Sequence, residues 1–160
     1  MSLADLRREY ALAALDERSV DRDPLRQLHA WLAEAGRADL REPNAMTLAT
    51  ATAGGVPSAR VVLLKGADEH GLVFFTDTRS RKGRELAGNP RAALVFWWGE
   101  LERQVRIEGA VAPVSEEEAD AYYRTRPEGS RLSAWASEQS SVVPDRPTLE
   151  RRLTRGDRPP

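Results

Sequence analysis

The 160-residue sequence has no cysteine, only two histidines and no long apolar run. The absence of cysteine excludes disulfides, thiolate metal sites, iron–sulfur clusters and cysteine nucleophiles. The spacing of His29 and His70 does not give the H-x-x-x-H pattern of a metal-binding pair. No stretch approaches the ~18 apolar residues that span a bilayer, and the first ten residues contain acids and no apolar core of a secretory signal. We therefore expect a cytoplasmic protein without a metal centre.

The charges of the two signs nearly cancel, because 24 basic residues face 25 acidic ones and the formal net charge is −1. That balance argues against a partner that is nucleic acid or a membrane surface. Almost all of the basic residues are arginine, and only Lys65 and Lys82 are lysine. Codon usage explains this ratio as well as function does, but lysine supplies a compact ammonium group that arginine replaces poorly. Both lysines are therefore candidate ligand-binding residues.

Hydrophobic periodicity divides the chain into a helical beginning, a strand-rich middle and a helical end. It predicts helices over residues 4–15, 24–36, 80–87, 115–123, 130–140 and 149–154. It predicts strands over residues 45–51, 58–65, 72–76, 92–98 and 101–114, of which the first three form an antiparallel meander. Strands with helices around and after them indicate an α+β fold whose sheet closes as a small barrel.

Four polar clusters are candidate binding sites. Residues 60–65 form a strand with a cation at each end, which suits an anion-binding edge or a buried strand with snorkelling ends. Residues 76–82 combine hydroxyl groups with three cations at a helix start, which suits a phosphate site or a capped, solvated helix terminus. Residues 122–130 suit a second phosphate site or an ordinary basic helix end. Gln139 and Ser140 can hydrogen-bond a heterocycle or cap a helix.

Eight segments of the sequence together resemble one family, the pyridoxamine/pyridoxine 5′-phosphate oxidases of the FMN-binding split-barrel class. In chain order, these segments are LRREY at 6–10, DPL at 23–25, RVVLLK at 60–65, FFTDTRSRK at 74–82, NPRAAL at 89–94, LERQVRIEG at 101–109, YYRTRP at 122–127 and AWASEQSS at 134–141. Each segment alone is a weak signal, whereas their combination and order are specific.

The resemblance implies a mainly β variant of the α+β class, an antiparallel Greek-key split barrel with flanking helices. It implies a homodimer with FMN in clefts at the subunit interface. The implied reaction oxidises the 4′ carbon of pyridoxamine or pyridoxine 5′-phosphate to pyridoxal 5′-phosphate, with O2 as the acceptor and release of H2O2, in vitamin B6 biosynthesis or salvage. Two alternatives are another split-barrel flavoprotein, such as a phenazine-type oxidase, and a non-catalytic protein that binds flavin or pyridoxal phosphate.

The resemblance also implies site residues, although it assigns no single catalytic residue. Arg81 and Lys82 hold the FMN phosphate, and Gln139 and Ser140 come from the neighbouring subunit. The full set of FMN contacts is Arg60, Val61, Val62, Leu63, Leu64, Lys65, Phe75, Thr76, Arg81, Lys82, Gln104, Gln139 and Ser140. The substrate contacts are Lys65, Tyr122, Arg126 and Ser130 at its phosphate, and Arg7, Arg8, Glu9 and Tyr10 in a covering segment.

The family continues beyond the last of these motifs into strands that carry a W-G-G-like segment, a second tryptophan and an R-x-H-x-R run. We therefore expect residues 1–160 to form a single FMN-binding split-barrel domain that lacks the family's C-terminal dimerisation and substrate segment. We expect these residues alone to be a poor oxidase.

Overall fold

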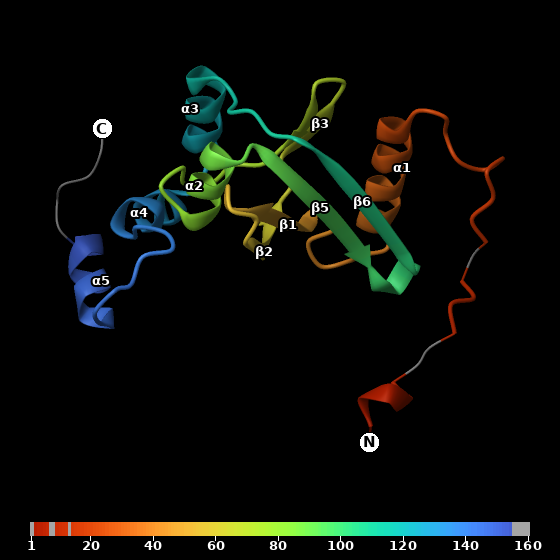
Figure 1. Cartoon of the computed structure of the whole chain (residues 1–160), viewed down its shortest axis with the longest axis horizontal. Coiled ribbons are helices and arrows are strands. Elements are labelled where there is room, and N and C mark those ends of the chain that lie inside the picture. The colour runs from red at the N-terminus through yellow and green to blue at the C-terminus, as the bar shows by residue number, and fades with distance from the viewer. Residues whose placement is uncertain (1, 7–8, 13, 155–160) are drawn as a thin grey trace. The chain divides into compact units, whose positions relative to one another are not determined.

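Helices lie toward both ends of the chain, and strands predominate between them, in the computed structural model, which describes residues 2–6, 9–12 and 14–154 (Figure 1). The first half contains the 3-10 turn η1 (Leu3–Asp5), the helix α1 (Pro24–Arg37) and the strands β1 (Ala45–Ala51), β2 (Pro57–Leu63), β3 (Gly66–Asp68) and β4 (Gly71–Val73). The second half contains α2 (Arg81–Gly88), β5 (Arg91–Trp98), the 3-10 turn η2 (Gly99–Leu101), β6 (Arg103–Ala110), α3 (Glu116–Thr125), α4 (Glu128–Ala136) and α5 (Arg146–Thr154).

Four of the strands form one sheet in the order β2-β1-β5-β6, and β3 pairs antiparallel with β4 in a second sheet. The expected fold class, helices combined with an antiparallel sheet, is confirmed. The expected three-stranded meander is wrong, because the strand predicted at 72–76 is the shorter β4 and pairs with β3. The cause is a tight turn in which the Asp68 carboxylate accepts a hydrogen bond from the His70 N–H at 2.8 Å and Gly71 adopts a φ of +141°.

The four-stranded sheet buries alternate residues of its central strands, as the two-residue period of a strand requires. In β1 the buried residues are Met46, Leu48 and Thr50, and in β5 they are Leu94, Phe96 and Trp98. The alternating residues are more exposed, and Val61 of β2 and Trp97 of β5 reach 67% and 58% exposure. Neighbouring tryptophans thus lie on opposite faces, and the indole N–H of the buried Trp98 donates to the Pro43 carbonyl at 2.9 Å.

The chain divides into two compact units, which we describe separately. The first comprises Met1–Leu48, Val61–Phe74 and Leu94–Ile107, and the second comprises Ala49–Arg60, Phe75–Ala93 and Glu108–Pro160. In the first unit, the Arg103 guanidinium at the start of β6 donates to the Glu34 carboxylate of α1 at 2.5 Å and lies over the Trp31 ring of α1 at 5.2 Å from its centroid. The single-domain organisation stays a prediction.

The predicted helix starts at residues 24, 80 and 115 are confirmed by their capping side chains. The Asp23 carboxylate accepts the Leu25 N–H at 2.9 Å, and Pro24 occupies the first turn of α1. The Ser80 hydroxyl caps α2, and the Ser115 hydroxyl accepts the Glu118 N–H at 3.1 Å at the start of α3. The helix predicted at 130–140 is displaced, because α4 already ends at Ala136 and residues 137–141 form a turn.

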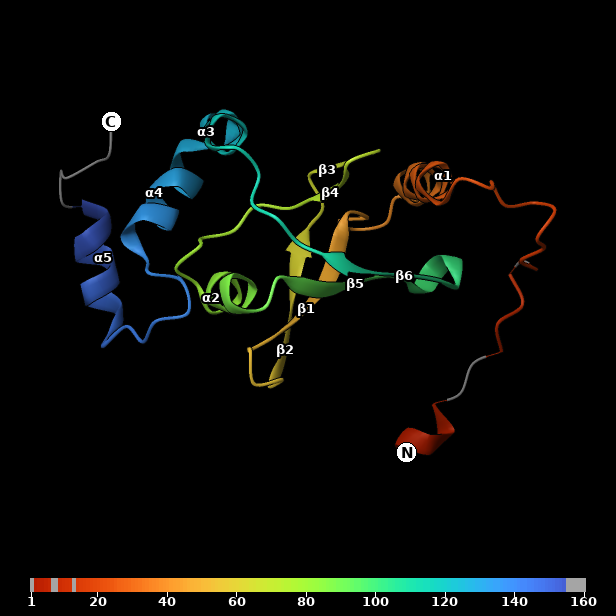
Figure 2. The same cartoon turned by 45° about the horizontal axis from the view of Figure 1, so that its top comes forward.

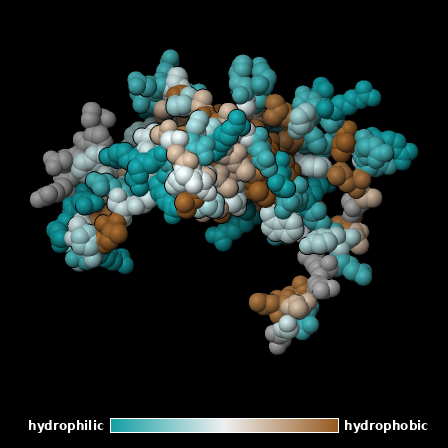
Figure 3. Space-filling view, in the orientation of Figure 1, coloured by the Kyte–Doolittle hydropathy of each residue, from teal (hydrophilic) through white to brown (hydrophobic). Residues whose placement is uncertain are grey.

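The helix predicted over residues 4–15 is wrong for the described part of that range, which contains only the short turn η1. The apolar side chains of this range are exposed: Leu6 is 63%, Tyr10 is 68% and Leu12 is 61% exposed, and Figure 3 shows hydrophobic surface along the N-terminal segment. A short helix without tertiary packing is marginal in water. The Leu12 N–H instead donates to the Glu102 carboxylate at 2.9 Å.

Candidate functional site

The first turn of α2, in the second unit, gathers positive charge. Ser80 is fully buried and its hydroxyl accepts the Gly83 N–H at 3.3 Å. The N–H groups of Arg81 and Lys82 precede the intrahelical ladder, so they add to the positive end of the helix dipole. Arg79 lies just before this turn and pairs with Asp77 at 3.2 Å. A helix start that carries cationic side chains has the chemistry of an anion site.

Lys82 is the buried member of this group, with a relative exposure of only 8%. Its ammonium group donates to the amide oxygen of Gln139 at 2.6 Å. Burial, together with the nearby charge of Arg60, lowers the pKa of Lys82, and Asp77 only partly opposes this effect. The charged lysine is therefore held in a place where an added anion would stabilise it.

A buried carboxylate, Glu85, lies one turn further along α2 and connects the helix to two strands. Its Oε2 accepts the hydroxyl groups of Thr50 and Ser58, each at 2.5 Å, and Nη2 of Arg60 at 3.3 Å. Its Oε1 accepts Nε of Arg81 at 2.8 Å. The hydroxyl groups of Ser58 and Thr50 and then the two guanidinium groups lower the pKa of Glu85 to about 2, against the opposing effect of burial. Glu85 is thus ionised at neutral pH.

Arg60 projects from β2 toward this carboxylate, on the opposite face from the exposed Val61. Its Nη1 donates to the Thr50 hydroxyl at 2.6 Å, and its Nη2 donates to the Ser58 hydroxyl. The side chain is 21% exposed. The predicted alternation is therefore confirmed for Arg60 and Val61, whereas Leu63 is partly buried although the two-residue period places it on the side of Val61. The alternation directs one cation of the RVVLLK segment into the second unit's polar cluster.

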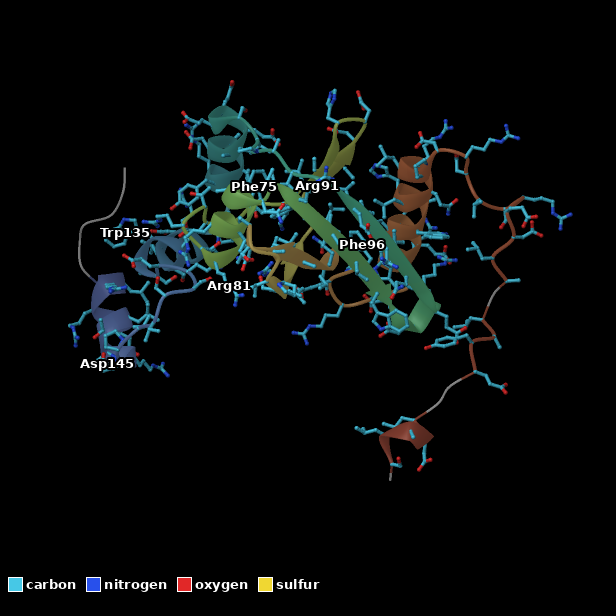
Figure 4. All side chains as sticks on the ribbon, in the orientation of Figure 1. Phe75, Arg81, Arg91, Phe96, Trp135 and Asp145 are labelled. Atoms are coloured by element: carbon cyan, nitrogen blue, oxygen red, sulfur yellow. The ribbon has the colours of Figure 1, made fainter. Side chains whose placement is uncertain are left out.

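Two aromatic rings join the segment before α2 to α3. Phe75 and Tyr122 stack with ring centroids 3.8 Å apart and planes inclined by 4° (Figure 4 labels Phe75). Arg126 caps the C-terminus of α3, and its Nη2 lies 3.4 Å from the Ser130 carbonyl oxygen in the first turn of α4. The structure therefore brings Tyr122, Arg126 and Ser130 to the adjoining ends of α3 and α4.

Gln139 lies at the same cluster in a way that the family resemblance did not anticipate. Its amide oxygen accepts Lys82 Nζ at 2.6 Å and the Thr76 hydroxyl at 3.5 Å. Figure 2 shows the reason, because the chain leaves α4 and passes beside α2 before it enters α5. Within one chain, Gln139 therefore lies at the helix start of α2. The expectation that Gln139 and Ser140 contact FMN of the neighbouring subunit stays a prediction. Ser140 follows with an exposed side chain and a φ of +68°.

The other predicted residues lie in the first unit. Leu64 is 7% exposed, and its N–H donates to the Asn44 carbonyl at 2.9 Å. Val62 and Leu63 are partly buried, whereas Lys65, Gln104, Glu9 and Tyr10 are exposed. Arg7 and Arg8 lie outside the described residues. Lys65 follows β2, and its N–H donates to the Val73 carbonyl at 2.8 Å.

Four residues of the cluster were missed by the sequence predictions: Thr50, Ser58, Gly83 and Glu85. Two signals point to them, namely the four-residue spacing of Arg81 and Glu85 and the polar side chains on the buried face of β1 and β2. Gly83 is required by close approach, because a Cβ atom there would lie 2.2 Å from the Thr78 carbonyl oxygen. The described residues contain no cluster of three or more His, Cys, Asp or Glu side chains placed to bind a metal ion.

Comparison with solved structures defines the class of the fold. PhzG from Burkholderia lata 383, solved with tetrahydrophenazine-1-carboxylic acid, is 35% identical, with a TM-score of 0.83 over 88% of this chain and 70% of that one. A pyridoxamine 5′-phosphate oxidase-related, FMN binding protein from Nostoc punctiforme is 22% identical, with a TM-score of 0.62 over 82% of this chain and 73% of that one. The fold is that of the FMN-binding split barrels.

Comparison of sequences gives the family. Residues 32–157 match the sequence model of the pyridoxamine 5′-phosphate oxidases. The pyridoxine/pyridoxamine 5′-phosphate oxidase of Ralstonia pickettii is 60% identical over 99% of this chain and 77% of its own length. The enzyme of that name from Rubrobacter xylanophilus is also 60% identical, over 98% of this chain and 72% of its own. The chain belongs to the pyridoxamine 5′-phosphate oxidase family of oxidoreductases, as its motifs predict.

The described helices include none that is long and apolar enough to cross a membrane.

Proposed function

We propose that the chain binds FMN with the flavin's phosphate at the first turn of α2. The observation that carries this proposal is the buried Lys82, whose pKa is lowered and whose ammonium group is held beside the helix start by the neutral amide of Gln139. In this proposal the flavin's phosphate adds an anionic partner to the neutral amide that the Lys82 ammonium group contacts. Arg81 contributes the next cation on the same turn.

The charge of the cluster fits a phosphate monoester. Arg60, Arg81 and Lys82 contribute three positive charges and Glu85 one negative charge, which leaves two positive charges. A phosphate monoester carries about −1.5 to −2 near pH 7. Charge-assisted hydrogen bonds to guanidinium and ammonium groups are the strong class of polar contact. The residues present therefore suit the phosphate end of FMN.

We further propose that the reaction is oxidation of pyridoxamine or pyridoxine 5′-phosphate to pyridoxal 5′-phosphate, with O2 as the acceptor and H2O2 released. When bound, FMN supplies the redox chemistry by taking two electrons from the substrate's 4′ carbon. The chain's own residues hold the substrate: Tyr122, Arg126 and Ser130, with Lys65, grip its phosphate. That phosphate is remote from the reacting carbon, so its binding energy serves to orient the 4′ carbon. Support comes from the names of the relatives that are 60% identical.

A second candidate function is oxidation of a reduced phenazine precursor. One observation favours it, the TM-score of 0.83 with PhzG solved in complex with tetrahydrophenazine-1-carboxylic acid. Such a substrate offers a carboxylate in place of a phosphate monoester. The guanidinium of Arg126 suits either anion, so only the measured turnover of each substrate distinguishes the two candidate functions.

We also propose that two copies of the chain form a homodimer. The exposed face of the first unit supports this, because Val61 and Trp97 are apolar and yet 67% and 58% exposed. A second copy that covers these two side chains would remove their apolar surface from water, which favours association.

The test combines a binding and a turnover experiment. Purified protein is titrated with FMN while flavin fluorescence is followed, and H2O2 release is then measured with pyridoxine phosphate, pyridoxamine phosphate and a reduced phenazine carboxylate. We expect saturable FMN binding and slow peroxide release with the two phosphorylated pyridines, in keeping with a poor oxidase. Absence of FMN binding refutes the cofactor proposal, and turnover of the phenazine compound alone establishes the second candidate.

A further inference from the structure

The Glu85 carboxylate accepts hydrogen bonds from four side chains on three elements, which is more than a contact between a helix and a sheet needs. The donors are Thr50 of β1, Ser58 and Arg60 of β2, and Arg81 of α2. We propose that Glu85 is a positioning residue, whose carboxylate fixes the guanidinium groups of Arg60 and Arg81 for a phosphate bound at the first turn of α2. This inference rests on the proposed FMN site.

The two hydroxyl groups transmit the orientation of Glu85 to Arg60. A hydroxyl has one proton to donate, and Thr50 and Ser58 each donate theirs to Oε2 of Glu85 at 2.5 Å. Their lone pairs are therefore free to accept, and Arg60 uses them: Nη1 donates to Thr50 at 2.6 Å and Nη2 donates to Ser58. Glu85 thus sets the direction of the Arg60 guanidinium both directly and through two relays.

Arg81 is held by one edge only. Its Nε donates to Oε1 of Glu85 at 2.8 Å, while the side chain remains 54% exposed. Within the described residues, the terminal nitrogens of Arg81 make no other hydrogen bond to protein, so four N–H donors remain available. Fixing a guanidinium before the ligand arrives lowers the entropy that binding must spend to order it. Glu85 therefore prepares Arg81, labelled in Figure 4, for an anion.

The direction in which removal of the Glu85 charge changes FMN affinity distinguishes a positioning role from a purely electrostatic effect. Coulomb's law predicts that removing a negative charge near an anion site strengthens anion binding. The positioning role predicts the opposite, because Arg60 and Arg81 lose their common anchor. Glu85→Gln keeps the shape of the side chain and removes the charge, so it decides between the two.

The experiment compares FMN with riboflavin, the same flavin without the phosphate. Dissociation constants are measured by fluorescence titration of the full chain for wild type, Glu85→Gln and Thr50→Val, which deletes one relay hydroxyl at nearly constant volume. Glu117→Gln is the control, because it removes the same charge from an exposed position in the first turn of α3.

We expect Glu85→Gln to weaken FMN binding about tenfold or more, with riboflavin binding unchanged. Thr50→Val raises the ratio of the dissociation constants for FMN and riboflavin as well, by a smaller factor, and Glu117→Gln leaves this ratio unchanged. Unchanged or tighter FMN binding by Glu85→Gln overturns the inference, as does an equal loss for both flavins, which indicates a purely structural role. If Glu85→Gln does not fold, an unchanged ratio in Thr50→Val overturns it. A wild type that does not prefer FMN to riboflavin refutes the proposed FMN site instead.

Discussion

Replacing Lys82 by methionine removes the ammonium group of the candidate phosphate site and keeps most of the apolar stem. The buried stem continues to pack, because methionine is unbranched and of similar length. The protein partner lost is the amide oxygen of Gln139, 2.6 Å away. Burial lowers the pKa of Lys82, which means that the folded protein disfavours the charged form. We therefore expect the ligand-free variant to be at least as stable as wild type.

The expected loss appears in flavin binding. A hydrogen bond to a charged group contributes about 1.5–3 kcal/mol, and about 1.4 kcal/mol corresponds to a factor of ten in affinity. We therefore expect FMN to bind Lys82→Met about ten- to a hundredfold more weakly, while riboflavin binding stays unchanged.

The pH dependence of stability and of FMN binding in the wild-type protein also reports on the charge of Lys82. Because the folded-state pKa of Lys82 lies below the ordinary value of 10.5, the unfolded chain binds more protons between these two values. This group therefore makes the ligand-free protein more stable as the pH rises through that window. A bound phosphate favours the ammonium form, so FMN binding at alkaline pH should take up protons.

The assay is a pair of fluorescence titrations together with urea unfolding of the ligand-free proteins. Arg84→Met is the matched control, because Arg84 is an exposed cation on the same helix and its guanidinium donates to the Arg79 carbonyl. It should leave both flavin affinities unchanged. Wild-type FMN affinity in Lys82→Met, or an equal loss of affinity for both flavins, would refute the reasoning.

Three further predictions concern other parts of the second unit. Arg126→Ala should raise the KM for pyridoxine phosphate about tenfold or more, with a smaller change in kcat and unchanged FMN affinity; an unaltered KM rejects its role. The pKa of Glu85 is about 2 against an ordinary value of 4.5, so stability from this group is complete above pH 4.5 and is lost as the pH falls toward 2. The stability of Glu85→Gln should therefore fall less steeply than that of wild type between pH 4.5 and 2 in acid unfolding, and the same dependence in both proteins would contradict the prediction. Gly83→Ala places a Cβ atom 2.2 Å from the Thr78 carbonyl oxygen, so unfolding in urea should show a loss of about 1–3 kcal/mol, and wild-type stability would contradict the contact.

Short sequence patterns predicted those helices and strands that are determined by residues close to one another in the chain. The alternation of β1 gave its exact bounds, and Ser80 marked the start of α2 because a capping hydroxyl acts on the next turn. The helix expected at 4–15 failed because its existence depends on a packing partner elsewhere in the chain. The strand expected at 72–76 was assigned the wrong neighbour because pairing depends on turn geometry as well as on composition.

The sequence predicted the cations of the candidate site, but it predicted fewer of the side chains that hold these cations in place. The TDTRSRK segment places Arg81 and Lys82 at a helix start by sequence alone. The network around Glu85 joins residues 50, 58, 60 and 85. The two-residue spacing of Ser58 and Arg60 places them on one face of β2, but no local spacing indicates that this face meets Glu85 of α2. The contact of Gln139 with Lys82 spans 57 positions, and it depends on how the chain returns after α4.

The neighbouring tryptophans of β5 give the protein two natural optical reporters. Trp98 is 3% exposed and its indole is hydrogen-bonded, so its emission should be blue-shifted and should change when the sheet unfolds. Trp97 is 58% exposed, so its emission should be red-shifted and open to quenching by iodide or acrylamide. Because the two rings lie on opposite faces of one strand, a partner that covers the open face would protect Trp97 from quencher and leave Trp98 unaltered. Single-tryptophan variants that retain one of these two residues would therefore report association and folding as separate signals.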